Sequence, residues 1–184
     1  MGHPVLLVHS GGPQGAGQGS APFVARLRQE LGAGYEVLFP MMPDPEEPSY
    51  ARWSERLDQL LADAEEDVVI VGHSLGGSVA LKHLAEAGGA GIAGLVLVAA
   101  PYWGDQGWAA QWALPEGWPT SSSELPPTFL FHSRDDEDVA FGDLERYAER
   151  LPGATARPLD GNGHLFDRGD LSEIVVAIRR LAEA

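Results

Sequence analysis

Cysteine is absent from the 184-residue sequence, which excludes disulfide bonds, thiolate catalysis and cysteine-ligated zinc in these residues. Basic residues are scarce: 12 lysines and arginines stand against 27 aspartates and glutamates, so the formal net charge is −15. A charge of this sign and size repels nucleic-acid phosphates and anionic membrane surfaces at long range. We therefore expect neither a nucleic acid nor a membrane as a partner.

Long apolar runs are missing as well. No stretch reaches transmembrane length, and the first residues do not combine a charged region with a long apolar one, as a secretory signal would. Leu6 stands where a myristoylation signal needs serine or threonine. We therefore expect a cytoplasmic protein, and the length and the 44% apolar composition predict one globular domain over residues 1–184.

Short apolar runs alternate along the chain with segments of helical spacing. The apolar runs are typical of buried strands and cover Pro4–Val8, Tyr35–Phe39, Val68–Val71, Leu95–Ala99, Thr128–Phe131 and Thr155–Leu159. Helical spacing is found over Pro22–Leu31, Tyr50–Ala64, Leu75–Ala87, Phe141–Leu151 and Leu171–Ala182. This alternation predicts an α/β fold, in which helices cover both faces of a mostly parallel sheet of about six strands. In such sheets the ligand site lies beyond the carboxyl ends of the strands, so the loops that follow the strands are where chemistry is expected.

The loop after the first predicted strand is rich in glycine and reads VHSGGPQGAGQGS over Val8–Ser20. A phosphate-binding Walker loop that starts at Gly12 needs a lysine at position 18, which is Gln18. No register of these glycines gives the dinucleotide pattern G-x-G-x-x-G. A nucleotide site is therefore disfavoured, and the loop needs another explanation.

The third predicted strand runs directly into Gly72-His73-Ser74-Leu75-Gly76, and a helical pattern begins at once. This is the G-x-S-x-G nucleophile elbow in its required context of strand, sharp turn and helix. Side chains at Gly72 and Gly76 would collide across the turn, and the strained turn holds the Ser74 hydroxyl exposed at a helix N-terminus. A serine that merely caps a helix would explain neither glycine.

A serine nucleophile needs a histidine base and an orienting carboxylate, and in such folds the carboxylate follows the serine in the chain and the histidine comes last. The loop after the sixth predicted strand offers His164 as the base. The loop after the fifth offers Asp135, Asp136 and Asp138, which compete for the role of the acid. A calcium loop is disfavoured there because position 141 is not glycine.

The glycine-rich loop then has a use in the same chemistry. One donor of an oxyanion hole is the backbone N–H after the nucleophile, here that of Leu75, and the other comes from a loop after a neighbouring strand. We assign Gly11 as this second donor, although Ser10 or Gly12 could take the role. No metal ion and no organic cofactor is required.

These residues together resemble the α/β-hydrolase superfamily, and more narrowly the small single-domain serine hydrolases related to retinoblastoma-binding protein nine. The narrower resemblance rests on FPMMPDPEEPSYARW, GHSLGG, AAPYW, SRDDEDV and GNGHLF, and it spans nearly the whole chain. It implies a minimal sheet with strand order 2-1-3-4-5-6 and the elbow strand at its centre.

The resemblance also bears on the acid and on partners. It implies Asp136 as the acid. Glu137 and Ala140 stand where relatives commonly have proline, so Asp135 remains an alternative for the acid. The retinoblastoma-binding motif L-x-C-x-E cannot exist in a chain without cysteine. The resemblance therefore does not imply the retinoblastoma protein as a partner of this chain.

Residues 101–126, between the fourth and fifth predicted strands, hold four of the five tryptophans, namely Trp103, Trp108, Trp112 and Trp118. We interpret this segment as an insertion or a lid-like segment in which Trp103 and Trp108 roof an apolar acyl pocket. A cluster that closes the end of the sheet, or a dimer interface, would explain the same residues. The protein could thus be a monomer or a homodimer.

The sequence therefore predicts a serine hydrolase that cleaves a small neutral or apolar ester. Ser74 attacks the carbonyl carbon, His164 takes the serine proton and Asp136 orients the imidazole. Two alternatives remain at this point: a binding or regulatory protein that keeps the hydrolase scaffold without turnover, and an acyltransferase or amide hydrolase.

Overall fold

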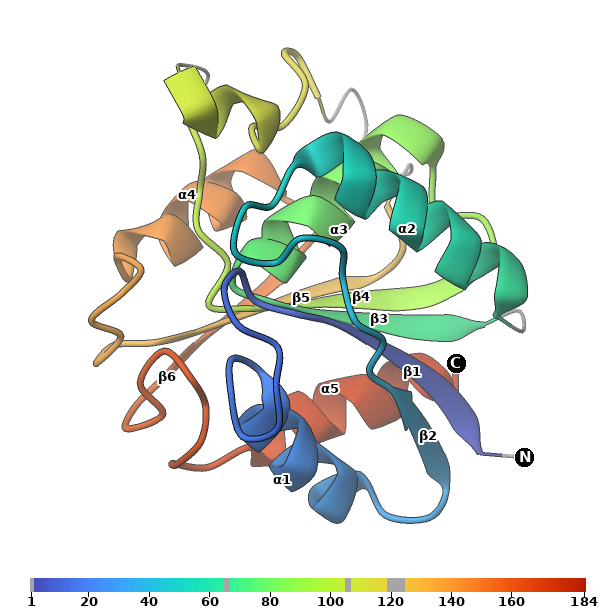
Figure 1. Ribbon diagram of the computed structural model, residues 1–184. Helices are drawn as coiled ribbons and strands as arrows, with labels where there is room; N and C mark the ends of the chain where they lie inside the picture. The colour runs from blue at the N-terminus through green and yellow to red at the C-terminus, as the bar shows by residue number, and fades with distance from the viewer. Residues whose placement is uncertain (1, 65–66, 105–106, 119–124) are drawn as a thin grey trace.

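A six-stranded parallel sheet forms the centre of the molecule in the computed structural model, which describes residues 2–64, 67–104, 107–118 and 125–184. The strand order is β2-β1-β3-β4-β5-β6, and every neighbouring pair is parallel (Figure 1). The strands are β1 (His3–Val8), β2 (Tyr35–Leu38), β3 (Val68–His73), β4 (Ile92–Val98), β5 (Thr128–Ser133) and β6 (Thr155–Leu159). The predicted fold class and strand order are confirmed.

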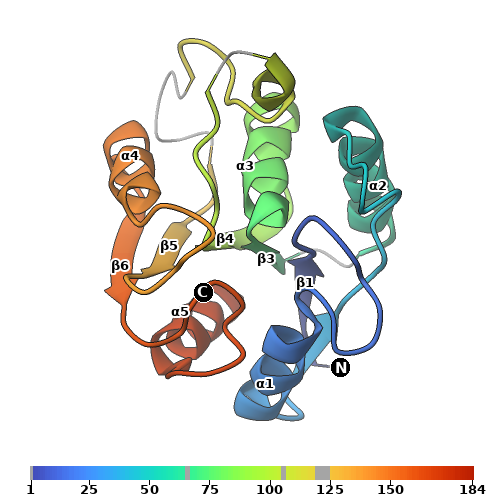
Figure 2. The same ribbon diagram turned by 60° about the vertical axis from the view of Figure 1, so that its left-hand side comes forward.

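In the described parts of the chain, five α-helices cover the two faces of the sheet. They are α1 (Ala21–Leu31), α2 (Tyr50–Asp63), α3 (Leu75–Ala87), α4 (Gly142–Arg150) and α5 (Ser172–Ala182), and a short 3₁₀ helix, η1, spans Gly107–Gln111. Helices α1 and α5 lie on one face, whereas α2, α3 and α4 lie on the other (Figure 2).

The alternation of side chains along each strand divides the core into two layers. Leu7 and Val71 pack with the apolar faces of α1 and α5, whereas Leu6 and Ile70 pack with those of α2, α3 and α4. Successive strand residues point to opposite faces of a sheet, so a strand covered on both sides must be apolar throughout. The central strand β3 is buried over its whole length for this reason.

The element boundaries differ from the predicted ones by a few residues. Strand β4 begins at Ile92, three residues before the predicted Leu95, and so includes Gly94. A side chain at Gly94 would overlap Leu181 of α5, so the missing side chain makes room for the helix. Strand β3 continues through His73, directly up to Ser74.

The tryptophan-rich segment is joined to the helices on one face of the sheet. The Gln111 side chain accepts a hydrogen bond from the Tyr50 N–H of α2 at 3.1 Å, and its carbonyl oxygen accepts one from Lys82 Nζ of α3 at 2.8 Å. Residues 105–106 and 119–124 of the predicted segment 101–126 lie outside the described residues. Within the described parts of the chain, no helix is both long and apolar enough to cross a membrane.

Candidate active site

Ser74 lies in the tight turn between β3 and α3 with φ +52° and ψ −123°, a conformation that a residue with a side chain rarely adopts. Such a backbone costs on the order of 1–3 kcal/mol. A Cβ at Gly72 would lie 2.7 Å from the backbone nitrogen of Gly77, and one at Gly76 would overlap the carbonyl oxygens of Val8 and His9. The two glycines of the motif are therefore required by close backbone packing, as the sequence predicts.

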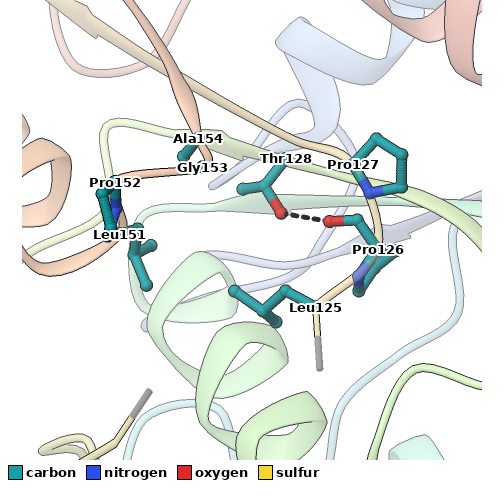
Figure 3. A pocket seen from close by; sticks show the side chains of 8 residues that line it. All are labelled: Leu125, Pro126, Pro127, Thr128, Leu151, Pro152, Gly153 and Ala154. Carbon is teal, nitrogen blue, oxygen red and sulfur yellow. Dashed lines mark hydrogen bonds between the residues drawn. The ribbon is translucent and has the colours of Figure 1, made fainter. Parts of the chain in front are cut away.

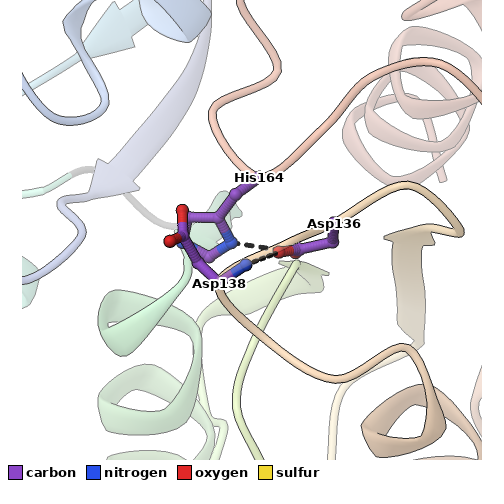
Figure 4. A group of neighbouring side chains, drawn as sticks. All are labelled: Asp136, Asp138 and His164. Atoms are coloured by element: carbon purple, nitrogen blue, oxygen red, sulfur yellow. Dashed lines mark hydrogen bonds and ion pairs between the residues drawn. The ribbon is translucent and has the colours of Figure 1, made fainter.

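The structure brings the three predicted side chains of the triad together at the carboxyl edge of the sheet. His164 Nε2 lies 3.0 Å from Ser74 Oγ, and His164 Nδ1 lies 2.8 Å from Asp136 Oδ2. Figure 4 shows the Asp136 carboxylate directed at the imidazole of His164. Both distances are those of hydrogen bonds. A proton can therefore pass from the Ser74 hydroxyl to Nε2 while the Nδ1–H group of His164 stays hydrogen-bonded to the Asp136 carboxylate.

Asp136, rather than Asp135, lies beside His164, and its carboxylate is fully buried. Its Oδ1 accepts hydrogen bonds from the N–H groups of Asp138 and Val139, each at 2.9 Å. Burial of this carboxyl group would raise its pKa, but the polar contacts with His132 and His164 and the Val139 N–H lower the pKa below its ordinary value. Asp136 therefore carries a negative charge at neutral pH.

Asp135 joins the two loops that carry the acid and the base. Its Oδ1 accepts hydrogen bonds from the N–H groups of Gly161 and Gly163, both at 3.1 Å, and also contacts the Ser133 hydroxyl. The Ser133 hydroxyl and the Gly163 N–H, in this order, lower the pKa of Asp135 to about 2. Asp135 thus fixes the backbone just before His164.

His73, inside the elbow, is hydrogen-bonded to the backbone of the loop that carries His164. Its Nε2 lies 2.8 Å from the carbonyl oxygen of His164, and its Nδ1 lies 2.8 Å from Ser20 Oγ. Because a carbonyl oxygen only accepts, the proton is on Nε2, and burial lowers the pKa of His73 to about 4, which keeps the ring neutral. Sequence reasoning missed this contact, since nothing in the pattern pairs residues 73 and 164.

His132, the residue before the last in β5, is a second histidine beside the Asp136 carboxylate. Its Nε2 lies 3.0 Å from Asp136 Oδ2 and 3.2 Å from the carbonyl oxygen of Val139. Sequence reasoning did not single out His132. The available signal was its spacing of four residues from Asp136 at the same strand end.

Ser74 and His164 open into a cleft of about 600 Å³. Trp103 and Trp108 line this cleft, and Trp108 remains 58% exposed. Trp112 and Trp118 are buried in the core beside α2 and α3. The interpretation of the segment as a cluster that closes the end of the sheet fits these two tryptophans. The remaining described lining residues are Gly11, Gly12, Pro45, Glu46, Pro48, Leu75, Pro101, Tyr102, Asp138, Val139, Ala140 and Asp143.

Two backbone N–H groups beside Ser74 make no hydrogen bond with any part of the chain that the structure describes. They belong to Gly11 and Leu75, and both residues line the cleft. The neighbouring donors in the glycine-rich loop are already used: the Ser10 N–H binds Ser20 Oγ at 2.9 Å, and the Gly12 N–H binds the carbonyl oxygen of Pro45 at 2.8 Å.

Asp136, Asp138 and His164 could also be considered as metal ligands, because one ligand atom of each lies within 4.8 Å of the others (Figure 4). Asp136 Oδ2 and His164 Nδ1 already bind one another. A metal ion held by these two atoms would replace the hydrogen bond that orients the imidazole. The group therefore fits a catalytic histidine better than a metal site.

A second cavity, of about 340 Å³, lies at the opposite ends of β5 and β6 (Figure 3). It is lined by Leu125–Thr128 and Leu151–Ala154, and the Thr128 hydroxyl donates a hydrogen bond to the carbonyl oxygen of Pro126 at 2.8 Å. Its described lining includes no titratable side chain. The cavity is therefore apart from the chemistry around Ser74.

Comparisons with known proteins agree with this geometry. A family model described as serine hydrolase matches residues 25–177. No curated protein matches the chain by sequence.

Solved structures match over nearly the whole chain. The ydeN gene product of B. subtilis is 18% identical with a TM-score of 0.76, over 98% of this chain and 100% of the other. A 2-hydroxy-6-oxo-6-phenylhexa-2,4-dienoate hydrolase (BphD) from Rhodococcus sp. strain RHA1 is 16% identical with a TM-score of 0.78, over 100% and 91%. The esterase RhEst1 from Rhodococcus sp. ECU1013 is 19% identical with a TM-score of 0.70, also over 100% and 91%. At these identities the likeness shows the shared α/β-hydrolase fold.

Proposed function

The chain belongs to the serine hydrolase family, and from this premise we propose that it hydrolyses a small neutral or apolar carboxylic ester with Ser74 as nucleophile. The observation that carries the proposal is the continuous chain of contacts from Ser74 Oγ through the His164 imidazole to Asp136 Oδ2, at 3.0 and 2.8 Å. These contacts end at Ser74, which lines a cleft large enough for a small ester.

In the first half of the reaction, Ser74 Oγ forms a bond to the ester carbonyl carbon while its proton passes to His164 Nε2. The tetrahedral intermediate then breaks its bond to the alkoxide, which leaves as the alcohol with the proton from His164. In the second half, a water molecule gives its proton to His164 and attacks the acyl-enzyme. The carboxylic acid leaves, and the proton returns to Ser74 Oγ.

Asp136 supports both halves without taking part in proton transfer. Its ionised carboxylate keeps the Nδ1–H of His164 in place, so Nε2 is the nitrogen that faces Ser74. The same negative charge stabilises the imidazolium that forms in each half-reaction.

The N–H groups of Gly11 and Leu75 form the oxyanion hole in this proposal. Support comes from the hydrogen bonds of the neighbouring candidates, since the N–H groups of Ser10 and Gly12 are bound to other parts of the chain. The N-terminus of α3 adds a favourable dipole for negative charge at the same place.

The charges around the cleft indicate the class of acyl group. Glu46, Asp138 and Asp143 contribute carboxylates, and the described lining holds neither lysine nor arginine. An acyl chain that carries its own carboxylate would be repelled and would find no cationic partner. Neutral esters are therefore the preferred substrates.

Hydrolysis of paired p-nitrophenyl esters tests the proposal. We expect the butyrate to be cleaved with a kcat/KM at least about 10-fold above that of the glutarate monoester, because like-charge repulsion acts only on the latter. Asp138→Asn should narrow this difference, and Ser74→Ala should abolish both activities. Folded wild-type protein that cleaves no ester would favour the binding-protein alternative, and transfer of the acyl group to an added alcohol in place of water would indicate an acyltransferase.

A further inference from the structure

His132 is a buried histidine that the reaction described above does not use. Its side chain is 2% exposed, and its ring packs edge-on against Phe141 with the ring centroids 5.9 Å apart. Nε2 faces two oxygen atoms, Asp136 Oδ2 at 3.0 Å and the carbonyl oxygen of Val139 at 3.2 Å.

The two neighbours of Nε2 decide where the ring carries a proton. A carbonyl oxygen and an ionised carboxylate are both acceptors, so Nε2 must be the donor. The N–H is hydrogen-bonded to Val139, and the carboxylate oxygen lies close beside it. A buried N–H dipole at this distance stabilises negative charge on Asp136 Oδ2.

The contact with Val139 completes a ring of interactions around the carboxylate. The Val139 N–H donates to Asp136 Oδ1 at 2.9 Å, while the Val139 carbonyl oxygen accepts from His132 Nε2. His132 therefore acts on both carboxylate oxygens, on Oδ2 directly and on Oδ1 by holding the turn that supplies its donor. Rotation of the carboxylate away from His164 would break contacts on both sides.

We propose that His132 is a positioning residue for the catalytic acid, which fixes the orientation and the charge of the Asp136 carboxylate so that His164 is held toward Ser74. This inference rests on the proposed function. His132 touches neither the substrate nor the reacting atoms, and it acts only through Asp136.

Two substitutions separate this role from simple packing. His132→Leu fills the site without a donor, whereas His132→Gln places an amide N–H close to the position of Nε2. We expect His132→Leu to lower kcat by about 10- to 100-fold with KM changed by less than about 2-fold, because orientation of the base is lost while the cleft is intact. His132→Gln should recover most of the lost kcat.

A double-mutant cycle with Asp136→Ala tests the route of the effect. If His132 acts through Asp136, His132→Leu should change kcat by less than about 2-fold in the Asp136→Ala background. Thermal unfolding of each variant checks that it is folded. If the leucine variant does not fold, His132→Asn replaces it, since the shorter amide falls short of Asp136 Oδ2.

The possible results are distinct. Wild-type kcat in His132→Leu, equal losses in the leucine and glutamine variants, or the same loss with and without Asp136 would each overturn the inference. A wild-type protein that cleaves no ester would instead overturn the proposed function.

Discussion

At the scale of single residues, the elbow depends on places where a side chain does not fit. Ser74 holds a strained backbone conformation, and Gly72 and Gly76 allow the turn to pack against α3 and the end of β1. Gly77 adds a third such position, because a Cβ there would lie 2.8 Å from Cβ of Ala100. The strain at Ser74 is thus maintained by close packing on several sides.

Substitution of Gly76 tests this packing. Gly76→Ala would push a methyl group into the carbonyl oxygens of Val8 and His9, which cannot move without displacing β1. We expect a loss of unfolding free energy of about 3 kcal/mol or more, together with loss of esterase activity. Gly142→Ala in α4 is the matched control, since open space surrounds Gly142 and its stability should stay within about 1 kcal/mol of the wild type. Equal stabilities of the two variants, measured by urea unfolding, would contradict this account.

At the scale of elements, the segment between β4 and β5 combines a buried part and a cleft-lining part. Trp112 is buried against Tyr50 of α2, with an edge-on contact of the two rings at 6.5 Å. Trp108 is the exposed neighbour, and its ring lies 5.4 Å from that of Trp112 and 5.5 Å from that of Trp103. Trp112 thus supports the side of the cleft that Trp108 lines.

The two tryptophans should respond differently to truncation. Trp112→Ala should cost about 3–5 kcal/mol of unfolding free energy, because it empties a buried site. Trp108→Ala should cost no more than about 1.5 kcal/mol and should raise KM several-fold, because it removes apolar surface from the cleft. Unfolding curves and Michaelis kinetics on both variants measure these effects, and a KM unchanged in Trp108→Ala would remove Trp108 from the substrate site.

Most of the elements could be predicted from the sequence, because apolar runs of strand length and the Gly-x-Ser-x-Gly spacing are local signals. The choice of Asp136 over Asp135 could not be made from the residues, since both follow the same strand and only the turn around Val139 decides which carboxylate faces His164. The contact of His73 with His164 was missed because it joins two loops that meet only in the folded chain. The contact of His132 with Asp136 is local, but the spacing of four residues does not by itself show that the turn brings the ring to the carboxylate.

At the scale of the whole molecule, the loops after β1, β3, β5 and β6 meet at one edge of the sheet and bring the site together (Figure 1). Two buried histidines, His9 and His73, lie at the ends of β1 and β3. Burial lowers the pKa of His9 and that of His73 to about 4 each, from an ordinary value of 6.5. The folded protein therefore keeps both rings neutral where the unfolded chain would protonate them.

This difference makes global stability depend on pH. Between pH 6.5 and about 4, His9 and His73 bind more protons in the unfolded chain than in the folded protein. The contribution of these two groups to the free energy of unfolding is therefore fully present above pH 6.5 and is lost as the pH falls toward 4. At pH 5 each histidine should account for up to roughly 2 kcal/mol of lost unfolding free energy. Urea unfolding at pH 7 and pH 5 measures the loss.

His9→Phe should make this loss smaller. The His9 ring stacks on Phe39 at 3.6 Å and its two nitrogens have no hydrogen-bond partner among the described residues, so an apolar ring suits the site. His73→Phe is the comparison, because it breaks the contacts with Ser20 and His164 and should destabilise the protein at both pH values. The same pH dependence in His9→Phe as in the wild type would show that His9 is not involved.

Activation of Ser74 by His164 and Asp136 is the central claim, and covalent labelling tests it most directly. Intact-mass measurement after treatment with a fluorophosphonate probe should show one adduct on the wild-type protein and none on Ser74→Ala, because only an activated serine attacks the phosphorus. Folded wild-type protein without an adduct, or an adduct that persists in Ser74→Ala, would contradict the account.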